Sequence, residues 1–247
     1  MSAPLFLVGA GALQSVTTGD VVRLDGPEGR HAATVTRLGH GEELLLADGS
    51  GRVARGRVAG VGKGELDVAI EDVTDEAPSQ PAFTLVQALA KNDRDLLAVE
   101  VATELGVDEV VPWAASRSVV VWRGDRAAKG HAKWTRTVQT ASKQARRARI
   151  PRVAEQVDRR GVTDRICAAD LALVLHEEAT EPLVSVDLPT HGEVLLVVGP
   201  EGGISAEELQ AFVDAGARAV RLGSIVLRTS TAGAAALAVL SGRTRWS

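Results

Sequence analysis

The stretch EVLLVVGPEGGISAEEL, residues 193–209, joins an unbroken apolar run to a glycine-rich turn and then to a helical pattern. A short continuous apolar run is typical of a strand that is buried on both faces of a parallel sheet. Ser205 is a predicted helix N-cap, and Glu208, three residues later, completes a capping box. The stretch therefore predicts a buried strand, a tight turn and a helix whose free N–H groups lie beside the glycines.

The composition of the turn favours a ligand-binding loop over a plain strand-to-helix connection. Gly199, Gly202 and Gly203 allow positive φ angles and a close approach to the backbone. Ligands of open α/β sheets bind at the carboxyl ends of the strands, which is where this turn is predicted to lie. No Gly-Lys-Ser/Thr follows, which excludes a Walker phosphate loop. LFLVGAGALQ at 5–14 begins like a dinucleotide motif, but Gln14 replaces its third glycine and no helix pattern follows.

Alternating strand and helix patterns surround this stretch. Apolar strands are predicted at 83–89, 107–113, 171–176 and 217–223, and helices at 93–106, 129–149, 205–216 and 231–240. This alternation predicts a parallel α/β sheet with helices on both faces.

The first part of the chain follows a different pattern. Residues 1–76 contain short apolar segments separated by Gly and Asp turns, with one possible short helix within 26–39, and they predict a small β-barrel. TDEAPSQPAF, at 74–83, contains two prolines and reads as a linker. We therefore expect two domains, residues 1–76 and residues 77–247.

The composition is that of an ordinary soluble protein, with 45% hydrophobic and 24% charged residues among 247. No apolar run reaches the roughly 18 residues of a membrane span, and no basic leader is present, so a cytoplasmic location is expected. The single cysteine, Cys167, excludes an internal disulfide and a Cys-rich metal site. Its apolar neighbours predict a buried thiol rather than a nucleophile. The histidines have no ligand partners close in sequence, so no metal is predicted.

A net charge of −4 conceals a basic block. Eleven Lys or Arg residues and one acid, Asp125, lie from Arg117 to Arg152. Such a block favours contact with RNA or DNA phosphates, and the alternative is a solvated helix face. Within it, apolar residues at helical spacing predict one buried stripe: Trp134, Val138, Ala141, Ala145 and Ala148.

A second loop pattern occurs in LGSIVLRTSTAGAAALAVL at 222–240. It ends a strand and enters an alanine-rich helix, for which Thr229, Ser230 and Thr231 are possible N-caps. Arg228 has apolar flanks in this loop, which favours a role in a site over that of an ordinary solvated residue.

Together, VVGPEGGISAEEL and LGSIVLRTSTA resemble the RsmE-type ribosomal small-subunit methyltransferases of the SPOUT class. QALAKNDRDLLAVEVATELGVDEVVPWAASRSVV at 87–120 is similar to the start of their catalytic domain. RHAATVTRLGHGEELLLADGSG at 30–51 is similar to their PUA-like RNA-binding domain. Ile225 and Ser230 stand where that family often has Arg and Glu.

The resemblance implies transfer of a methyl group from S-adenosylmethionine to N3 of one uridine in 16S rRNA. It also implies a SPOUT-type α/β domain with a C-terminal trefoil knot and a homodimeric protein. The implied cofactor-binding residues are Leu175, His176, Val198, Gly199, Pro200, Glu201, Gly202, Gly203, Leu222, Gly223, Ser224, Val226, Leu227, Thr231 and Ala232. The predicted RNA-binding residues are His31, Arg37, Arg117, Lys133, Arg136, Lys143 and Arg147. The alternatives are a SPOUT methyltransferase that acts on tRNA and a non-catalytic RNA-binding protein.

The predicted catalytic residues are Arg228 and Glu201. Arg228 is suited to stabilise the uracil imide anion that forms when the N3 proton leaves. Glu201 is suited to orient the base or to accept a hydrogen bond, although a structural role in the turn explains it equally well. We expect His176 to pack beside the cofactor rather than to act as a general base.

Overall fold

The computed structural model describes residues 3–246, which form two compact units. One unit extends to Pro78 and also includes Ser142–Ile150. The other consists of Ser79–Ala141 and the chain from Pro151 onward. The first unit therefore takes in a segment that lies far from it in sequence.

The first unit contains a five-stranded sheet in the order β1-β3-β4-β5-β2. All its pairs are antiparallel except β1 with β3. A short helix, α1 (Gly26–Arg30), continues into a π-helical turn at His31–Thr36, as the sequence predicts for 26–39. The strands are β1 (Leu5–Leu7), β2 (Val21–Leu24), β3 (Glu43–Ala47), β4 (Arg52–Gly62) and β5 (Glu65–Asp75).

One apolar core holds this unit together. Every strand and the π-helical turn contribute to it, and its members include Phe6, Leu24, Ala32, Leu44, Leu46, Val58, Leu66 and Val68. The hydrogen-bonded order does not close, because β1 and β2 are its two ends among the described residues.

The segment 142–150 packs on this sheet. The Gly51 N–H donates to the Ala148 carbonyl at 3.1 Å, and the Ile150 N–H donates to the Gly49 carbonyl at 3.0 Å. Lys143 forms an ion pair with Glu28 at 2.7 Å. These bonds hold residues 148–150 outside a helix. The helix predicted over 129–149 is therefore too long at its C-terminal end.

That helix, α3, spans Asp125–Gln144. Trp134, Val138 and Ala141 are buried, as the stripe predicts. Ala145, in contrast, is exposed, because the chain has left the helix and Arg146 has a φ of 53°. Ala148 is buried, but outside the helix.

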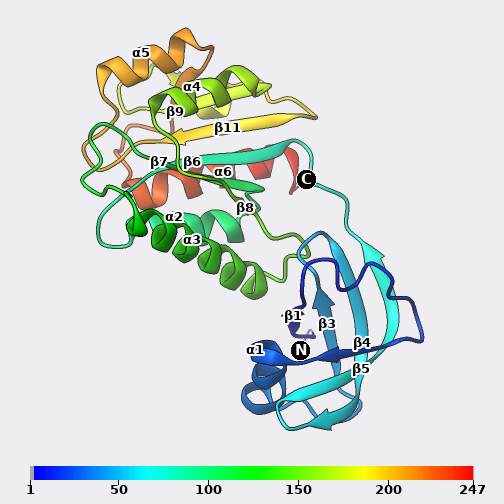
Figure 1. The fold of residues 1–247 in the computed structure, drawn as a ribbon. Helices are drawn as coiled ribbons and strands as arrows, with labels where there is room; N and C mark the ends of the chain where they lie inside the picture. Colours follow the sequence, from blue (N-terminus) through cyan, green and yellow to red (C-terminus); the bar gives the residue numbers. More distant parts are fainter. Residues whose placement is uncertain (1–2, 247) are drawn as a thin grey trace. The chain divides into compact units, whose positions relative to one another are not determined.

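The second unit is built on a seven-stranded sheet in the order β10-β12-β9-β11-β6-β7-β8, and every pair is parallel, as the sequence predicts (Figure 1). The strands are β6 (Ala82–Ala88), β7 (Glu109–Trp113), β8 (Arg152–Val153), β9 (Leu171–Leu175), β10 (Glu181–Pro182), β11 (Glu193–Val198) and β12 (Arg218–Arg221). The short strands β8 and β10 are too brief to give a sequence pattern.

Helices cover both faces of this sheet (Figure 1). On one face lie α4 (Arg159–Ala168) and α5 (Ala206–Asp214), which pack on a core that includes Val86, Leu195 and Val197. On the other lie α2 (Arg94–Glu104) and α6 (Thr229–Thr244). The sequence patterns missed α4, whose polar and charged residues leave only Val162 and Ile166 buried. Leu183–Ser185 form a 3-10 turn.

The structure bears on the exposure of Cys167 and on the apolar length of the helices. Cys167 is exposed rather than buried, because it lies at the end of α4 with its thiol 3.7 Å from the Ala215 carbonyl oxygen. Within residues 3–246, no helix is both long and apolar enough to cross a bilayer.

Candidate active site

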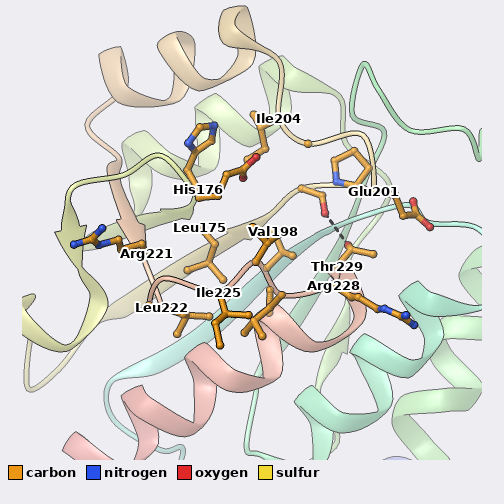
Figure 2. Close-up of a pocket in the computed structure, with 18 of the residues that line it drawn as sticks. Leu175, His176, Val198, Glu201, Ile204, Arg221, Leu222, Ile225, Arg228 and Thr229 are labelled. Atoms are coloured by element: carbon orange, nitrogen blue, oxygen red, sulfur yellow. Dashed lines mark hydrogen bonds between the residues drawn. The ribbon is translucent and has the colours of Figure 1, made fainter.

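A cavity of about 580 Å³ lies where three strands of the parallel sheet end (Figure 2). Its walls come from the residues that follow β9, β11 and β12, together with the start of α6. Because these strands are parallel neighbours, their carboxyl ends meet at one edge of the sheet. The fold therefore brings together the glycine turn and the later Leu-Arg-Thr loop, as the sequence predicts.

Most of the predicted cofactor-binding residues line this cavity. They are Leu175, His176, Val198, Gly199, Pro200, Glu201, Gly203, Leu222, Gly223, Ser224, Val226, Leu227 and Ala232, and Arg228 joins them. Gly202 and Thr231 are not among the lining residues. The sequence patterns missed Arg94, Glu177, Ile204, Val220, Arg221, Ile225 and Thr229. Three of these missed residues, Val220, Arg221 and Glu177, lie at or within two residues of the carboxyl end of a strand, which is the signal that points to them.

The three glycines of the turn have different surroundings. The sequence allows a positive φ at all three, and Gly203 is the one that uses it, with a φ of 72°. An added Cβ at Gly199 would lie 2.7 Å from Ile204 Cγ1. One at Gly202 would lie 3.1 Å from Arg117 Cβ. Gly203 is thus the glycine of the turn whose backbone conformation disfavours any side chain.

The helix after the turn begins as the capping box predicts. The Ser205 hydroxyl accepts from the Glu208 N–H, and the Glu208 carboxylate accepts from the Ser205 N–H at 3.1 Å. The same carboxylate accepts from the N–H and hydroxyl of Ser116, at 2.7 and 2.8 Å. Burial alone would raise the pKa of Glu208, but these hydrogen bonds outweigh it and hold the pKa below its ordinary value.

Glu208→Gln is expected to lower the free energy of unfolding by about 1–3 kcal/mol at neutral pH, because a buried acceptor of several N–H and O–H groups becomes a poorer one. Since folding lowers this pKa, the contribution is complete above the ordinary value of 4.5 and is lost as the pH falls through the lower folded value. Urea unfolding across this range measures the effect. Glu207→Gln is the matched control, because the Glu207 side chain is 88% exposed. If the wild type still had the larger free energy of unfolding in strong acid, the stabilising role of the Glu208 carboxylate would be contradicted.

Thr229 joins three parts of the site. Its hydroxyl donates to the Gly199 carbonyl at 2.7 Å (Figure 2). The same hydroxyl accepts from the Gln87 amide at 2.9 Å. These bonds connect β6, the glycine turn and the first turn of α6. Thr229 therefore holds the glycine turn in a fixed position relative to α6.

Glu201 is held from the side of α2. Its Oε1 accepts from the Lys91 N–H at 3.3 Å and from Arg94 Nη1 at 3.2 Å. Only one-fifth of the Glu201 side chain is exposed. In Figure 2, Glu201 and Arg228 lie toward one end of the cavity, whereas His176 and Arg221 lie toward the other.

Arg228 occupies the N-cap position of α6 in an extended conformation. Its carbonyl accepts from the N–H groups of Thr231 and Ala232, both at 2.9 Å. Its guanidinium is exposed and forms no hydrogen bond or ion pair with any residue from 3 to 246. Because the N-terminal end of a helix is itself positive, this position gives the cation no intrinsic stabilisation.

His176 is positioned mainly through its backbone. Its N–H donates to the Val220 carbonyl at 3.0 Å, and its Nδ1 accepts from the Glu178 N–H at 3.3 Å. The Nδ1 lone pair is therefore already engaged, and the packing of His176 beside the cofactor stays a prediction.

The predicted RNA-binding residues divide between the two units. His31, Arg37, Lys143 and Arg147 belong to the first unit, and Arg117, Lys133 and Arg136 belong to the second. Arg117 Nη1 donates to the Gly202 carbonyl at 3.1 Å, and Lys133 pairs with Asp93 at 3.0 Å. Lys143 is engaged with Glu28, and only 21% of its side chain is exposed. Among the described residues no group of His, Cys, Asp and Glu is arranged to hold a metal ion.

Two family models assign this fold and cavity to a class of protein, the RNA methyltransferases with a separate PUA domain. Residues 77–241 match the RNA methyltransferase domain, and residues 24–71 match the RNA methyltransferase PUA domain. A crystal structure of Ribosomal RNA small subunit methyltransferase E from Neisseria gonorrhoeae bound to S-adenosyl methionine is similar, with a TM-score of 0.86. It is 29% identical, with 98% of each chain covered. A putative methyltransferase from Legionella pneumophila in complex with the cofactor SAM has a TM-score of 0.84. It is 27% identical, with 99% of each chain covered.

Sequence relatives make the class more specific. Ribosomal RNA small subunit methyltransferase E of Mycobacterium tuberculosis is 47% identical over 93% of this chain and 89% of its own length. The Bacillus subtilis protein of the same name is 26% identical, over 94% and 93%. The chain belongs to the ribosomal RNA small subunit methyltransferase E family.

Proposed function

We propose that this protein transfers a methyl group from S-adenosylmethionine to N3 of one uridine in 16S rRNA. The observation that carries the proposal is the single cavity wall built from the glycine turn and the Leu222–Thr229 loop, with Glu201 and Arg228 at one end. Family membership supports the reaction and the small-subunit RNA. The choice of N3 rests on the resemblance to the family, and the two charged side chains suit the chemistry at that atom.

The cavity fits S-adenosylmethionine. Its volume, about 580 Å³, lies within the range of pockets that enclose molecules of this size. Leu175, Val198 and Leu222 offer apolar surface to an adenine ring, and the turn at Gly199–Gly203 offers backbone groups to its polar atoms. When bound, this cofactor supplies a methyl group already activated by a sulfonium, a chemistry that needs no metal.

The side chains of the protein must then accept the proton that leaves uracil and stabilise the negative charge that forms. The N3–H of uracil lies between two carbonyl groups, and its loss spreads negative charge over their oxygens. Arg228 has a free guanidinium at the cavity and would stabilise that charge. The Glu201 carboxylate, at the same end, would accept the hydrogen bond from N3–H.

Mass mapping of small-subunit RNA tests this proposal. The RNA, in naked and subunit-assembled forms, is incubated with protein and S-adenosylmethionine, then digested and sequenced by mass. One added methyl group on a single uridine, at a position that blocks Watson–Crick pairing, is expected. Methylation of a ribose, of another base, or of tRNA in preference to 16S rRNA would contradict the proposal.

The exposed face of α3 is the part of the second unit best suited to RNA phosphates. Arg136 is exposed and has no ion-pair partner among residues 3–246. Arg136→Ala is expected to weaken RNA binding and to reduce the salt slope by about one unit. Titrations at several salt concentrations measure the slope, and an unchanged slope would remove Arg136 from the interface.

Lys143→Ala is the contrasting variant. Because Lys143 pairs with Glu28 and lies 6.0 Å from the centre of the Phe6 ring, its loss should act first on folding of the first unit. The thermal unfolding temperature of the Lys143→Ala variant should fall, while the salt slope of its RNA binding changes less than in Arg136→Ala. A slope change equal to that of Arg136→Ala would restore Lys143 as a phosphate contact.

The remaining expectations follow from the same family. We infer a homodimer, a C-terminal trefoil knot and a cytoplasmic location, the last because a ribosomal RNA substrate is found there. Ile225 and Val226 are 79% and 73% exposed, an apolar surface that would favour association. Sedimentation equilibrium tests the dimer, and a monomer at micromolar concentration would contradict it.

A further inference from the structure

Arg94 is a cavity residue that lies 107 positions from Glu201 in sequence. It is the first residue of α2, and its Nη1 donates to Glu201 Oε1 at 3.2 Å. About a third of its side chain is exposed, compared with a fifth for Glu201. The pair thus lies at the cavity edge, partly shielded from water.

The two donors to Glu201 share one oxygen. The Lys91 N–H and the Arg94 guanidinium both bond to Oε1, whereas Oε2 accepts no hydrogen bond from any residue within 3–246. Two donors on one oxygen fix the plane of the carboxylate. The second oxygen keeps its full capacity to accept a proton or a hydrogen bond from a ligand.

Stability alone does not account for this arrangement. Partly exposed ion pairs contribute little to folding. A cation in the first turn of α2 also faces the positive end of the helix dipole. The feature that the pair does produce is a carboxylate of fixed orientation at the end of the cavity that Arg228 also lines.

We propose that Arg94 is a positioning residue that orients Glu201, so that Oε2 receives the N3 proton of the target uracil. The inference rests on the proposed function and adds a residue to its machinery. The N3–H proton passes to Oε2, and the electron pair of that bond remains on N3. Arg94 itself does not touch the base. It acts by holding Oε1.

A double-mutant cycle tests the inference. Arg94→Ala, Glu201→Gln and the double variant are compared in single-turnover methyl transfer to small-subunit RNA, counted at any position of the RNA. Each single variant should lose about 100-fold in rate, which is typical of a lost or misplaced proton acceptor. The double variant should be no slower than Glu201→Gln, because residues that act as a unit are not additive.

Two further measurements separate positioning from simple structure. Arg94→Lys keeps the charge but loses the planar fork, so it should restore part of the rate. S-adenosylmethionine affinity and the thermal unfolding temperature should stay near wild type in the Arg94 variants, and the rates of all variants are read at saturating S-adenosylmethionine. Arg159→Ala is the matched control, since it removes an exposed Arg–Glu pair, 3.8 Å from Glu207, that lines no part of the cavity.

Each contrary outcome has a distinct meaning. Losses that multiply to about 10,000-fold in the double variant, or a wild-type rate in Arg94→Ala, would overturn the positioning role. A rate loss that only follows weaker S-adenosylmethionine binding would also overturn it. These results leave the proposed function intact. A wild-type protein that methylates no small-subunit RNA would overturn the proposed function, and this inference with it.

Discussion

Gly203→Val is expected to abolish measurable binding of S-adenosylmethionine. Gly203 lines the cavity with a φ of 72°, a region that a β-branched residue reaches only under strain. The cost is about 1–3 kcal/mol, and relief of that strain would move the turn out of its binding position. Since each 1.4 kcal/mol is tenfold in affinity, a loss of about 10- to 100-fold follows from strain alone. An added Cβ would lie 3.8 Å from Arg117 Nη1, so the effect is expected from the strained backbone and not from a clash.

Isothermal titration of the folded variant measures this loss, and circular dichroism checks that the sheet is intact. Gly203→Ala serves as a milder second variant, because it carries the same backbone strain with little added bulk. Gly202→Ala is the matched control. Gly202 is outside the left-handed region and faces Arg117 instead of the cavity, so affinity should change only a few-fold. Equal effects at the two glycines would show that the turn binds no ligand at Gly203.

Arg228→Ala is expected to lose most of the methyl-transfer rate while keeping cofactor and RNA affinity within a few-fold. A contact made mainly in the transition state appears in the chemical step. Removal of one such donor typically costs about 100- to 1,000-fold in rate. The side chain has no partner among the described residues, so its loss should leave folding unchanged.

Arg228→Lys distinguishes two roles for the same cation. If the guanidinium grips the uracil, lysine keeps the charge but not the planar fork, and the rate stays low. Rescue of activity and RNA affinity together would assign Arg228 to an RNA phosphate instead. Single-turnover rates with saturating cofactor provide the comparison. A wild-type rate in Arg228→Ala would remove this residue from the mechanism.

Local signals in the sequence were enough for the central strand, turn and helix. The predicted strand at 193–198 coincides with β11, because five apolar residues in a row suit only a strand with two covered faces. The predicted N-cap at Ser205 is confirmed, since a capping box is a contact between residues three positions apart. The parallel sheet followed from the alternation of such patterns.

The same local rules failed where a distant segment competes. The helix predicted to 149 ends at Gln144, and residues 148–150 bond to Gly49, Gly51 and Glu76 instead of continuing it. Cys167 has apolar neighbours in sequence, but it is exposed near the end of α4. Nothing within either segment carries that information.

The sequence by itself determined the class of the protein and the two loops that form its candidate site. Strand, turn and cap patterns involve residues that lie close together in sequence, so their spacing can be recognised in the sequence itself. Only the tertiary structure decided which side chains meet there. Glu201 meets Arg94 across 107 positions, and Thr229 meets Gln87 across 142. Such pairs depend on the order of β6, β11, β9 and β12 in the sheet, and that order is set by how whole faces pack together.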